Sequence, residues 1–251
     1  MRRPILAANW KMNHGPTEAR DFMAAFLAAY APKSDRTVAI FPPALSLSTV
    51  RDALGSRTDI LIGVQNIHNE PKGAFTGENS APMARDAGAR LALVGHSERR
   101  HVFGETDEAT SKKCTLALQH GLIPMLCVGE KIDEREKGQT DAVVLRQLRA
   151  GLSAVDKKDL VRLLIAYEPV WAIGTGKTAT PADASTVHAV IRKELIALCG
   201  PKELAADIPI LYGGSVNRDN ARTLLQAPGV DGLLVGGASL EAGSWSAIAS
   251  T

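Results

Sequence analysis

The chain has 251 residues, and its 29 Lys and Arg residues nearly balance its 27 Asp and Glu residues, for a formal net charge of +2. This length fits one large domain or two small ones, and the balanced charge without a basic cluster argues against a nucleic acid as the main partner. Three widely spaced cysteines indicate neither a disulfide framework nor a zinc site, and no apolar run approaches the length of a membrane span, so we expect a soluble, cytoplasmic protein.

Short runs rich in Val, Ile and Leu recur along the chain and predict strands. They lie at about residues 5–8, 37–41, 60–64, 91–94, 122–128, 163–167, 208–212 and 231–235. The runs are continuous and not alternating, which is typical of parallel strands that are buried on both faces. Segments of helical period lie between them, including residues 105–120 and 133–153. This alternation favours an α/β fold, a closed (β/α)8 barrel that forms a single domain over residues 1–251, and a doubly wound open sheet is the alternative.

One connection departs from this pattern, the loop after the third predicted strand. Residues 65–82, QNIHNEPKGAFTGENSAP, show little periodicity and carry an isolated apolar residue, Phe75. Loops longer than ~12 residues without regular structure are uncommon in compact domains and are usually functional. Phe75 either inserts into a partner or folds back onto its own barrel, and the loop alone does not decide between these interpretations.

Polar residues that can do chemistry directly follow several predicted strands. Asn9 and Lys11 follow the first strand, His96 follows the fourth and Glu168 follows the sixth. In a parallel barrel, ligands bind where the strands end, so we expect an amide, a cation, an imidazole and a carboxylate to meet on one face. This combination is what a proton-transfer site requires.

The neighbours of His96 and the chemistry of lysine narrow two of these roles. Ser97 and Glu98 resemble the first turn of a helix, whose positive end favours a neutral imidazole that donates a hydrogen bond. Lys11 is a solvated charge, a Schiff-base amine or a cation that faces an anionic substrate. The last role is favoured, because an imine-forming aldolase places its lysine within a strand. The histidines show no metal-binding spacing, so we expect no metal.

Residues 163–178, LLIAYEPVWAIGTGKT, combine a predicted buried strand, Glu168 and a loop that contains two glycines. Thr180 can cap the following helix, and Pro181 suits its first position. A glutamate on a rigid strand before such a loop indicates a catalytic base with a lid, and an exposed glutamate on a surface turn is the alternative.

Glycines mark the ends of the last two predicted strands and the middle of this loop. Gly213, Gly214 and Ser215 follow the seventh strand, Gly236 and Gly237 follow the eighth, and Gly174 lies in the loop. Without Cβ atoms, successive backbone N–H groups can approach an anion closely, and barrels commonly bind phosphate after strands seven and eight. The pattern favours a phosphate site over simple turns.

Five motifs occur in order along the chain: NWKMN, GHSERR, AYEPVWAIGTGKT, YGGSV and LVGGASL. Together they resemble the triosephosphate isomerase family over essentially the whole length. The resemblance implies a cofactor-free, reversible interconversion of dihydroxyacetone phosphate and D-glyceraldehyde 3-phosphate through an enediolate, a step of glycolysis and gluconeogenesis. Glu168 would be the general base and neutral His96 the electrophile, while Lys11 and Asn9 would stabilise the substrate oxygens and the developing charge.

The resemblance also implies binding and supporting roles. The phosphate would be bound by the backbone amides of Gly174, Ser215, Gly236 and Gly237. Residues 169–178 would form the lid, which Tyr212 would brace near Ala179 when closed. Glu98 would pair with Lys11 and hold its ammonium group.

A homodimer is the assembly that the resemblance implies. The loop of residues 65–78 would dock on a second copy and bring Thr76 beside that copy's Asn9 and Lys11. This arrangement favours an interface role for Phe75.

Ala8 departs from the family, because a glycine is frequent at that position, and residues 66–72 carry none of its motifs. Cys127 lies inside a predicted strand, which suggests packing and not nucleophilic chemistry. Two rival functions remain: another phosphosugar barrel, such as an imine-forming aldolase or an epimerase, and a catalytically silent barrel that binds phosphate. The presence of all four catalytic side chains argues against a silent barrel.

Overall fold

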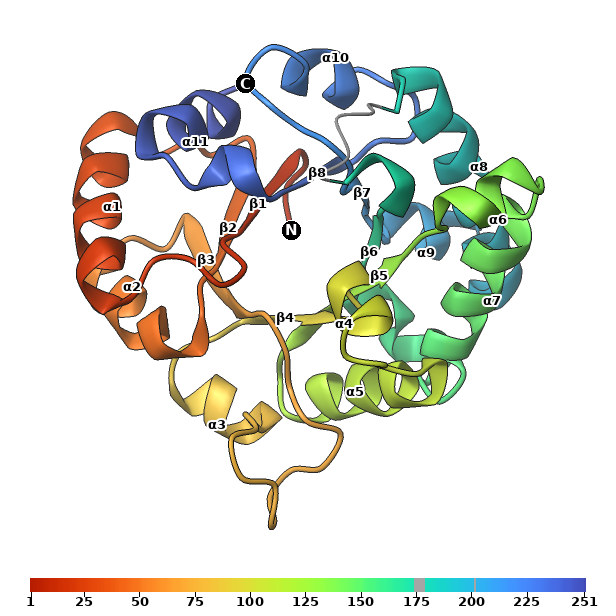
Figure 1. Ribbon diagram of the computed structural model, residues 1–251, viewed down its shortest axis with the longest axis horizontal. Coiled ribbons are helices and arrows are strands. Elements are labelled where there is room, and N and C mark those ends of the chain that lie inside the picture. The colour runs from red at the N-terminus through yellow and green to blue at the C-terminus, as the bar shows by residue number, and fades with distance from the viewer. Residues whose placement is uncertain (174–178, 201) are drawn as a thin grey trace.

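Figure 1 shows the computed structural model of the protein, which describes residues 1–173, 179–200 and 202–251. Within these ranges, eight parallel strands close into a barrel in chain order. They are β1 (Ile5–Asn9), β2 (Thr37–Phe41), β3 (Ile60–Val64), β4 (Leu91–Val94), β5 (Ile123–Val128), β6 (Leu164–Tyr167), β7 (Ile210–Tyr212) and β8 (Gly232–Val235). The closed barrel confirms the predicted architecture, and the open-sheet alternative is wrong because β8 pairs with β1.

Helices surround the barrel as an outer layer (Figure 1). The α-helices are α1 (Pro16–Ala29), α2 (Leu47–Leu54), α3 (Ala81–Asp86), α4 (Ser97–His101), α5 (Asp107–Gln119), α6 (Ile132–Glu136), α7 (Thr140–Leu152), α8 (Pro181–Cys199), α9 (Lys202–Asp207), α10 (Ala221–Leu225) and α11 (Ala242–Ala249). Short 3-10 helices are η1 (Ala44–Ser46), η2 (Lys157–Arg162), η3 (Val170–Ala172) and η4 (Gly237–Ser239). Within the described ranges, no helix combines the length and apolar character that a membrane crossing requires.

The helical pattern over residues 133–153 does not form one continuous helix. The segment is divided between α6 and α7, because Gly138 has a φ of 69° and turns the chain between them. A left-handed backbone conformation of this kind is accessible to glycine at little cost and ends a right-handed helix.

The strands separate two apolar layers. Side chains that point into the barrel form an inner cluster, which includes Ile5, Phe41, Met125 and Leu211. Side chains that point outward pack against the helices. Burial on both faces explains why the strand sequences are continuously apolar. Cys127 belongs to the inner cluster, and burial raises the pKa of its thiol well above the usual range, so it is a poor nucleophile.

Two glycines allow neighbouring strands to approach closely. A Cβ atom on Gly232 of β8 would lie 2.1 Å from the carbonyl oxygen of Ile5 in β1. A Cβ atom on Gly63 of β3 would lie 2.2 Å from the ring of Phe41 in β2. Both separations are far below van der Waals contact, so the barrel in this form needs glycine at these positions.

The long connection after β3 extends outward beyond the helical layer, beside α3 (Figure 1). Phe75 in this loop is 41% exposed. Its ring packs on His68 of the same loop, with 4.0 Å between ring centroids. Phe75 thus contacts its own loop and keeps a substantial part of its ring on the surface.

Candidate active site

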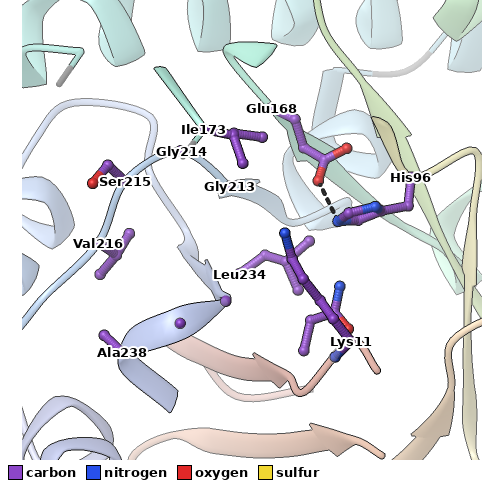
Figure 2. Close-up of a pocket in the computed structure, with 13 residues that line it drawn as sticks. Lys11, His96, Glu168, Ile173, Gly213, Gly214, Ser215, Val216, Leu234 and Ala238 are labelled. Carbon is purple, nitrogen blue, oxygen red and sulfur yellow. Dashed lines mark hydrogen bonds and ion pairs between the residues drawn. The ribbon is translucent and has the colours of Figure 1, made fainter. Parts of the chain in front are cut away.

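A cavity of about 290 Å³ opens at the carboxyl ends of the strands (Figure 2). It is lined by Asn9, Lys11, His96, Glu168, Ile173, Gly213, Gly214, Ser215, Val216, Leu234, Gly236, Gly237 and Ala238. The structure therefore brings together seven of the eight predicted catalytic and phosphate-binding residues, which come from the ends of five different strands. The eighth, Gly174, lies outside the described residues.

Glu168 follows β6 directly and is 2% exposed. Its carboxylate accepts two hydrogen bonds, from Nε2 of His96 at 2.9 Å and from the backbone N–H of Ser97 at 2.8 Å. Burial raises the pKa of Glu168. His96, the Ser97 N–H group and Lys11 together lower it by a larger amount, so the net pKa lies below the usual value. In this arrangement both carboxylate oxygens are engaged in hydrogen bonds within the protein.

His96 is the N-cap residue of α4, and Nδ1 of its ring accepts a hydrogen bond from the backbone N–H of Glu98 at 3.3 Å. An accepting Nδ1 carries no proton, so Nε2–H is the donor to Glu168. The dashed line in Figure 2 marks this contact between His96 and Glu168. Burial lowers the pKa of His96, but the carboxylates of Glu168 and Glu98 together raise it, so the net pKa lies above the usual value. The Nδ1 contact is compatible with a neutral ring, whereas the Glu168 carboxylate favours the protonated ring, so the neutral state stays a prediction.

Lys11 has a φ of 53°, a left-handed conformation that is unusual for a residue with a side chain. Local contacts hold it there, since its N–H donates to Oδ1 of Asn9 at 3.0 Å and its carbonyl accepts from Nε2 of Gln65 at 2.7 Å. Its ammonium lies 2.6 Å from the carboxylate of Glu98. The predicted pair of Lys11 and Glu98 is therefore present.

Gln65 is a supporting residue that the sequence analysis missed. Its side-chain amide donates both to Lys11 and to the carbonyl oxygen of Phe41, the latter at 2.9 Å. The available signal was its position as the first residue after β3, where other strand ends carry functional side chains.

The glycines that line the cavity have two effects: some allow neighbouring side chains to pack closely, and others leave the backbone open to a ligand. A Cβ atom on Gly214 would lie 2.2 Å from the hydroxyl of Tyr212 and 2.8 Å from Pro169. A Cβ atom on Gly236, which precedes η4, would lie 3.4 Å from the side chain of Lys11, whereas Gly237 faces open space. The cavity wall formed by Gly236 and Gly237 is therefore bare backbone near a cation, which suits a phosphate.

The first part of the predicted lid is anchored by a buried carboxylate that the sequence analysis also missed. Glu130 is 0% exposed and accepts hydrogen bonds from Nε1 of Trp171 at 2.8 Å and from the hydroxyl of Tyr167 at 3.2 Å. Arg135 lies 4.3 Å over the Trp171 ring and pairs with Asp183 at 2.7 Å. Asp183 belongs to the capping box of α8, so Arg135 connects the two ends of this loop.

Tyr212 and Thr76 lie outside the cavity wall. Tyr212 is fully buried, and its hydroxyl has no hydrogen-bond partner among the described residues. Thr76 is exposed on the long loop. Residues 174–178, the central part of the predicted lid, lie outside the described residues.

A second cavity of about 220 Å³ adjoins the first and shares Asn9, Lys11 and His96 with it. Its other lining residues are Met12, Gln65, Asn66, Leu93, Glu98, Arg99 and Phe103. Met12 is 95% exposed and Phe103 is 66% exposed. Large apolar side chains thus surround an opening that leads to the candidate catalytic residues.

Comparison with known proteins gives a consistent result. A sequence model of the family described as Triosephosphate isomerase matches residues 4–251. A protein named triosephosphate isomerase from Roseiflexus sp. is 50% identical over 245 residues, which cover 98% of this chain and 96% of that protein. A protein of the same name from Symbiobacterium thermophilum is 48% identical over 248 residues, which cover 99% of this chain and 96% of that protein. Another from Moorella thermoacetica is 50% identical over 249 residues, which cover 99% of this chain and 98% of that protein. The chain belongs to the triosephosphate isomerase family.

Proposed function

We propose that this protein interconverts dihydroxyacetone phosphate and D-glyceraldehyde 3-phosphate through an enediolate, as a single (β/α)8 domain. The observation that carries the proposal is the pair of His96 and Glu168, 2.9 Å apart in a cavity that Lys11 and two bare glycines also line, in a chain of this family. The reaction moves one proton between adjacent carbons, which needs a base, a hydrogen-bond donor and a cation.

Glu168 is the proposed base. Both of its oxygens are engaged, so it must give up at least one hydrogen bond before it can reach a substrate carbon. These hydrogen bonds lower its pKa, and their loss inside a buried site leaves burial as the larger effect, which raises the pKa. Moving towards the substrate therefore makes Glu168 a stronger base.

His96 is the proposed electrophile, which donates Nε2–H to the substrate carbonyl and shuttles protons between the two oxygens. When Glu168 leaves His96, the main influence that raises the His96 pKa is lost. The ring then acts as a neutral donor while negative charge develops on the substrate oxygen. Lys11 and Asn9 would offset and orient that charge from the adjacent strand end.

The phosphate would be bound by the backbone amides of Ser215, Gly236 and Gly237, together with Gly174 from outside the described residues. Residues 169–178 would close as a lid and exclude water, because the enediolate can otherwise expel phosphate. The anchoring of this loop on Glu130 and Arg135 supports a segment with fixed ends. The hydroxyl of Tyr212 has no hydrogen-bond partner among the described residues, which supports its proposed contact near Ala179.

We also propose a homodimer formed through the loop of residues 65–78. The exposed Met12 and Phe103 support this assembly, because they line the same cavity, and large apolar side chains that gather on a surface mark an interaction site. Thr76 of one copy would then lie near Asn9 and Lys11 of the other. A cytoplasmic location is supported by three buried cysteines that are all free thiols.

A coupled assay that starts from D-glyceraldehyde 3-phosphate tests the proposed reaction directly. Wild-type protein should produce dihydroxyacetone phosphate without added metal or cofactor, and absence of turnover would overturn the proposal. Borohydride trapping with substrate separates the aldolase alternative, since an imine on Lys11 would leave a stable adduct. No adduct is expected, because Nζ of Lys11 is engaged with the Glu98 carboxylate at 2.6 Å.

A further inference from the structure

The line along which β4 and β5 pair, here called the β4–β5 seam, ends just before His96. The two strands pair as far as Val94 and Leu126. Gly95 then adopts a φ of 70° and turns the chain away, so that His96 can cap α4. Beyond this point the carbonyl groups of Gly95 and Cys127 have lost the neighbouring strand as a partner, and buried carbonyls need another donor.

Arg100 of α4 supplies that donor. Its Nε donates to the carbonyl oxygen of Gly95 at 2.7 Å, and its Nη2 donates to the carbonyl oxygen of Cys127 at 3.2 Å. The guanidinium thus continues the β4–β5 seam after the strands separate. The Arg100 side chain is only 7% exposed, so these bonds are largely shielded from solvent.

The remaining contacts of Arg100 fix the orientation of its guanidinium group. Nη1 donates to Asp107 of α5 at 2.7 Å, and Arg146 also binds Asp107. A Cβ atom on Gly95 would lie 2.6 Å from Nη2 of Arg100 and 2.9 Å from Thr110, so the group is packed directly on the Gly95 backbone. Three nitrogen atoms serve three acceptors, which a lysine ammonium cannot reproduce.

The ends of β4 and β5 lead to the proposed electrophile, His96, and to the proposed base, Glu168. On one side, Gly95 immediately precedes His96. On the other side, β5 continues from Cys127 to Val128, whose carbonyl accepts the backbone N–H of Glu168 at 2.8 Å. The backbone of Glu168 is therefore fixed to the strand end that Arg100 ties to His96.

We propose that Arg100 is a positioning residue, which sets His96 relative to Glu168 by bridging the ends of β4 and β5. This inference rests on the proposed isomerase function. Arg100 itself does not line the cavity. It acts through the backbone of Gly95 and Cys127, and Asp107 holds it in the orientation that this requires.

The test compares Arg100→Met and Arg100→Lys with the control variant Arg146→Gln. Removal of Arg100 leaves Asp107 paired with Arg146, so no isolated buried charge is created. Misplacement of catalytic groups by less than an ångström costs turnover more than affinity, so we expect kcat to fall about 10-fold or more in both Arg100 variants, with a smaller change in KM. Arg146→Gln keeps all three contacts of Arg100 and should retain wild-type kinetics.

The pH dependence of kcat/KM separates positioning from a role in stability alone. The groups that lower the pKa of Glu168 are His96, the Ser97 N–H group and Lys11, and two of these lie in the turn that Arg100 supports. Loosening that turn should move the acid limb of the profile to higher pH in the Arg100 variants. A protein with a merely lower melting temperature would keep the wild-type limb.

Circular dichroism identifies the folded variants, and Arg100→Lys, which retains the charge and most of the volume, decides the question if Arg100→Met does not fold. Wild-type kcat together with an unmoved acid limb in a folded Arg100 variant overturns the inference. Inactive wild-type protein would instead overturn the proposed function.

The position of His96 can then still be tested by NMR. Faster solvent exchange of the His96 Nε2–H proton in Arg100→Lys than in wild-type protein is expected only if Arg100 holds the ring.

Discussion

The length of the Glu168 side chain is critical at the residue scale, because its carboxylate spans from β6 to both His96 and Ser97. Glu168→Asp withdraws the carboxylate by one methylene group while preserving its charge. We expect kcat to fall by ~10²-fold or more, since a misplaced base loses the near-attack geometry. Steady-state kinetics on folded protein checks this, with the exposed Glu136→Asp as the matched control. A near-normal rate for Glu168→Asp would refute its assignment as the base.

His188 makes stability depend on pH. Its ring is completely buried on α8, and Nδ1–H donates a hydrogen bond to the carbonyl oxygen of Gly229 at 2.9 Å. Burial lowers the pKa of His188 to about 4. The unfolded chain binds this proton near pH 6.5, so the contribution to stability is complete above that pH and is lost as the pH falls towards 4.

We therefore expect the wild-type free energy of unfolding to drop by about 2 kcal/mol more than that of His188→Asn between pH 7 and pH 4.5. Asparagine can keep a hydrogen bond to Gly229 but does not titrate in this range. Urea unfolding at the two pH values gives both differences. Parallel losses in the two proteins would show that His188 is not the titrating group.

The closure of the barrel depends at the element scale on the close approach of β8 to β1. Gly232→Ala would place a Cβ atom 2.1 Å from the backbone of Ile5, and backbone yields less readily than a side chain. Overpacking of this kind costs about 1–3 kcal/mol, so the melting temperature should fall by several degrees. Gly15→Ala is the control, because nothing lies within 4 Å of its added Cβ atom. Equal melting temperatures for the two variants would contradict this account of closure.

The sequence predicts those features that depend on local pattern. Continuous apolar runs reveal the strands, and polar residues directly after them reveal Asn9, Lys11, His96 and Glu168. The division between α6 and α7 could not be predicted, because a helical hydrophobic pattern persists across the turn at Gly138.

Functional support from distant residues is harder to predict. Glu130 looks like an ordinary acidic residue in a loop, and only the packing of Trp171 and Tyr167 around it reveals its role. Gln65 likewise acquires its function from the backbone of Lys11, which lies far away in the sequence. Contacts of this kind leave no periodic pattern, so they become visible only when the chain is folded.

The exposed apolar surface around the second cavity bears on the assembly of the whole molecule. Met12 follows Lys11 directly, and Phe103 lines the same opening, so a partner that covers these side chains would also enclose Lys11. Dimer formation would thereby keep Lys11 in its unusual conformation and exclude water from the site. Assembly and activity are expected to be lost together.

Phe75→Glu and Thr76→Arg test this coupling. Each places a charge on the tip of the loop that would be buried between two copies, and an unpaired charge at an interface is costly. We expect both variants to sediment as monomers and to have kcat/KM lower by about 10-fold or more. Lys137→Glu, on the exposed turn between α6 and α7, should remain dimeric and fully active. An intact dimer in both loop variants would refute the role of this loop, and monomers with full activity would refute the dependence of catalysis on assembly.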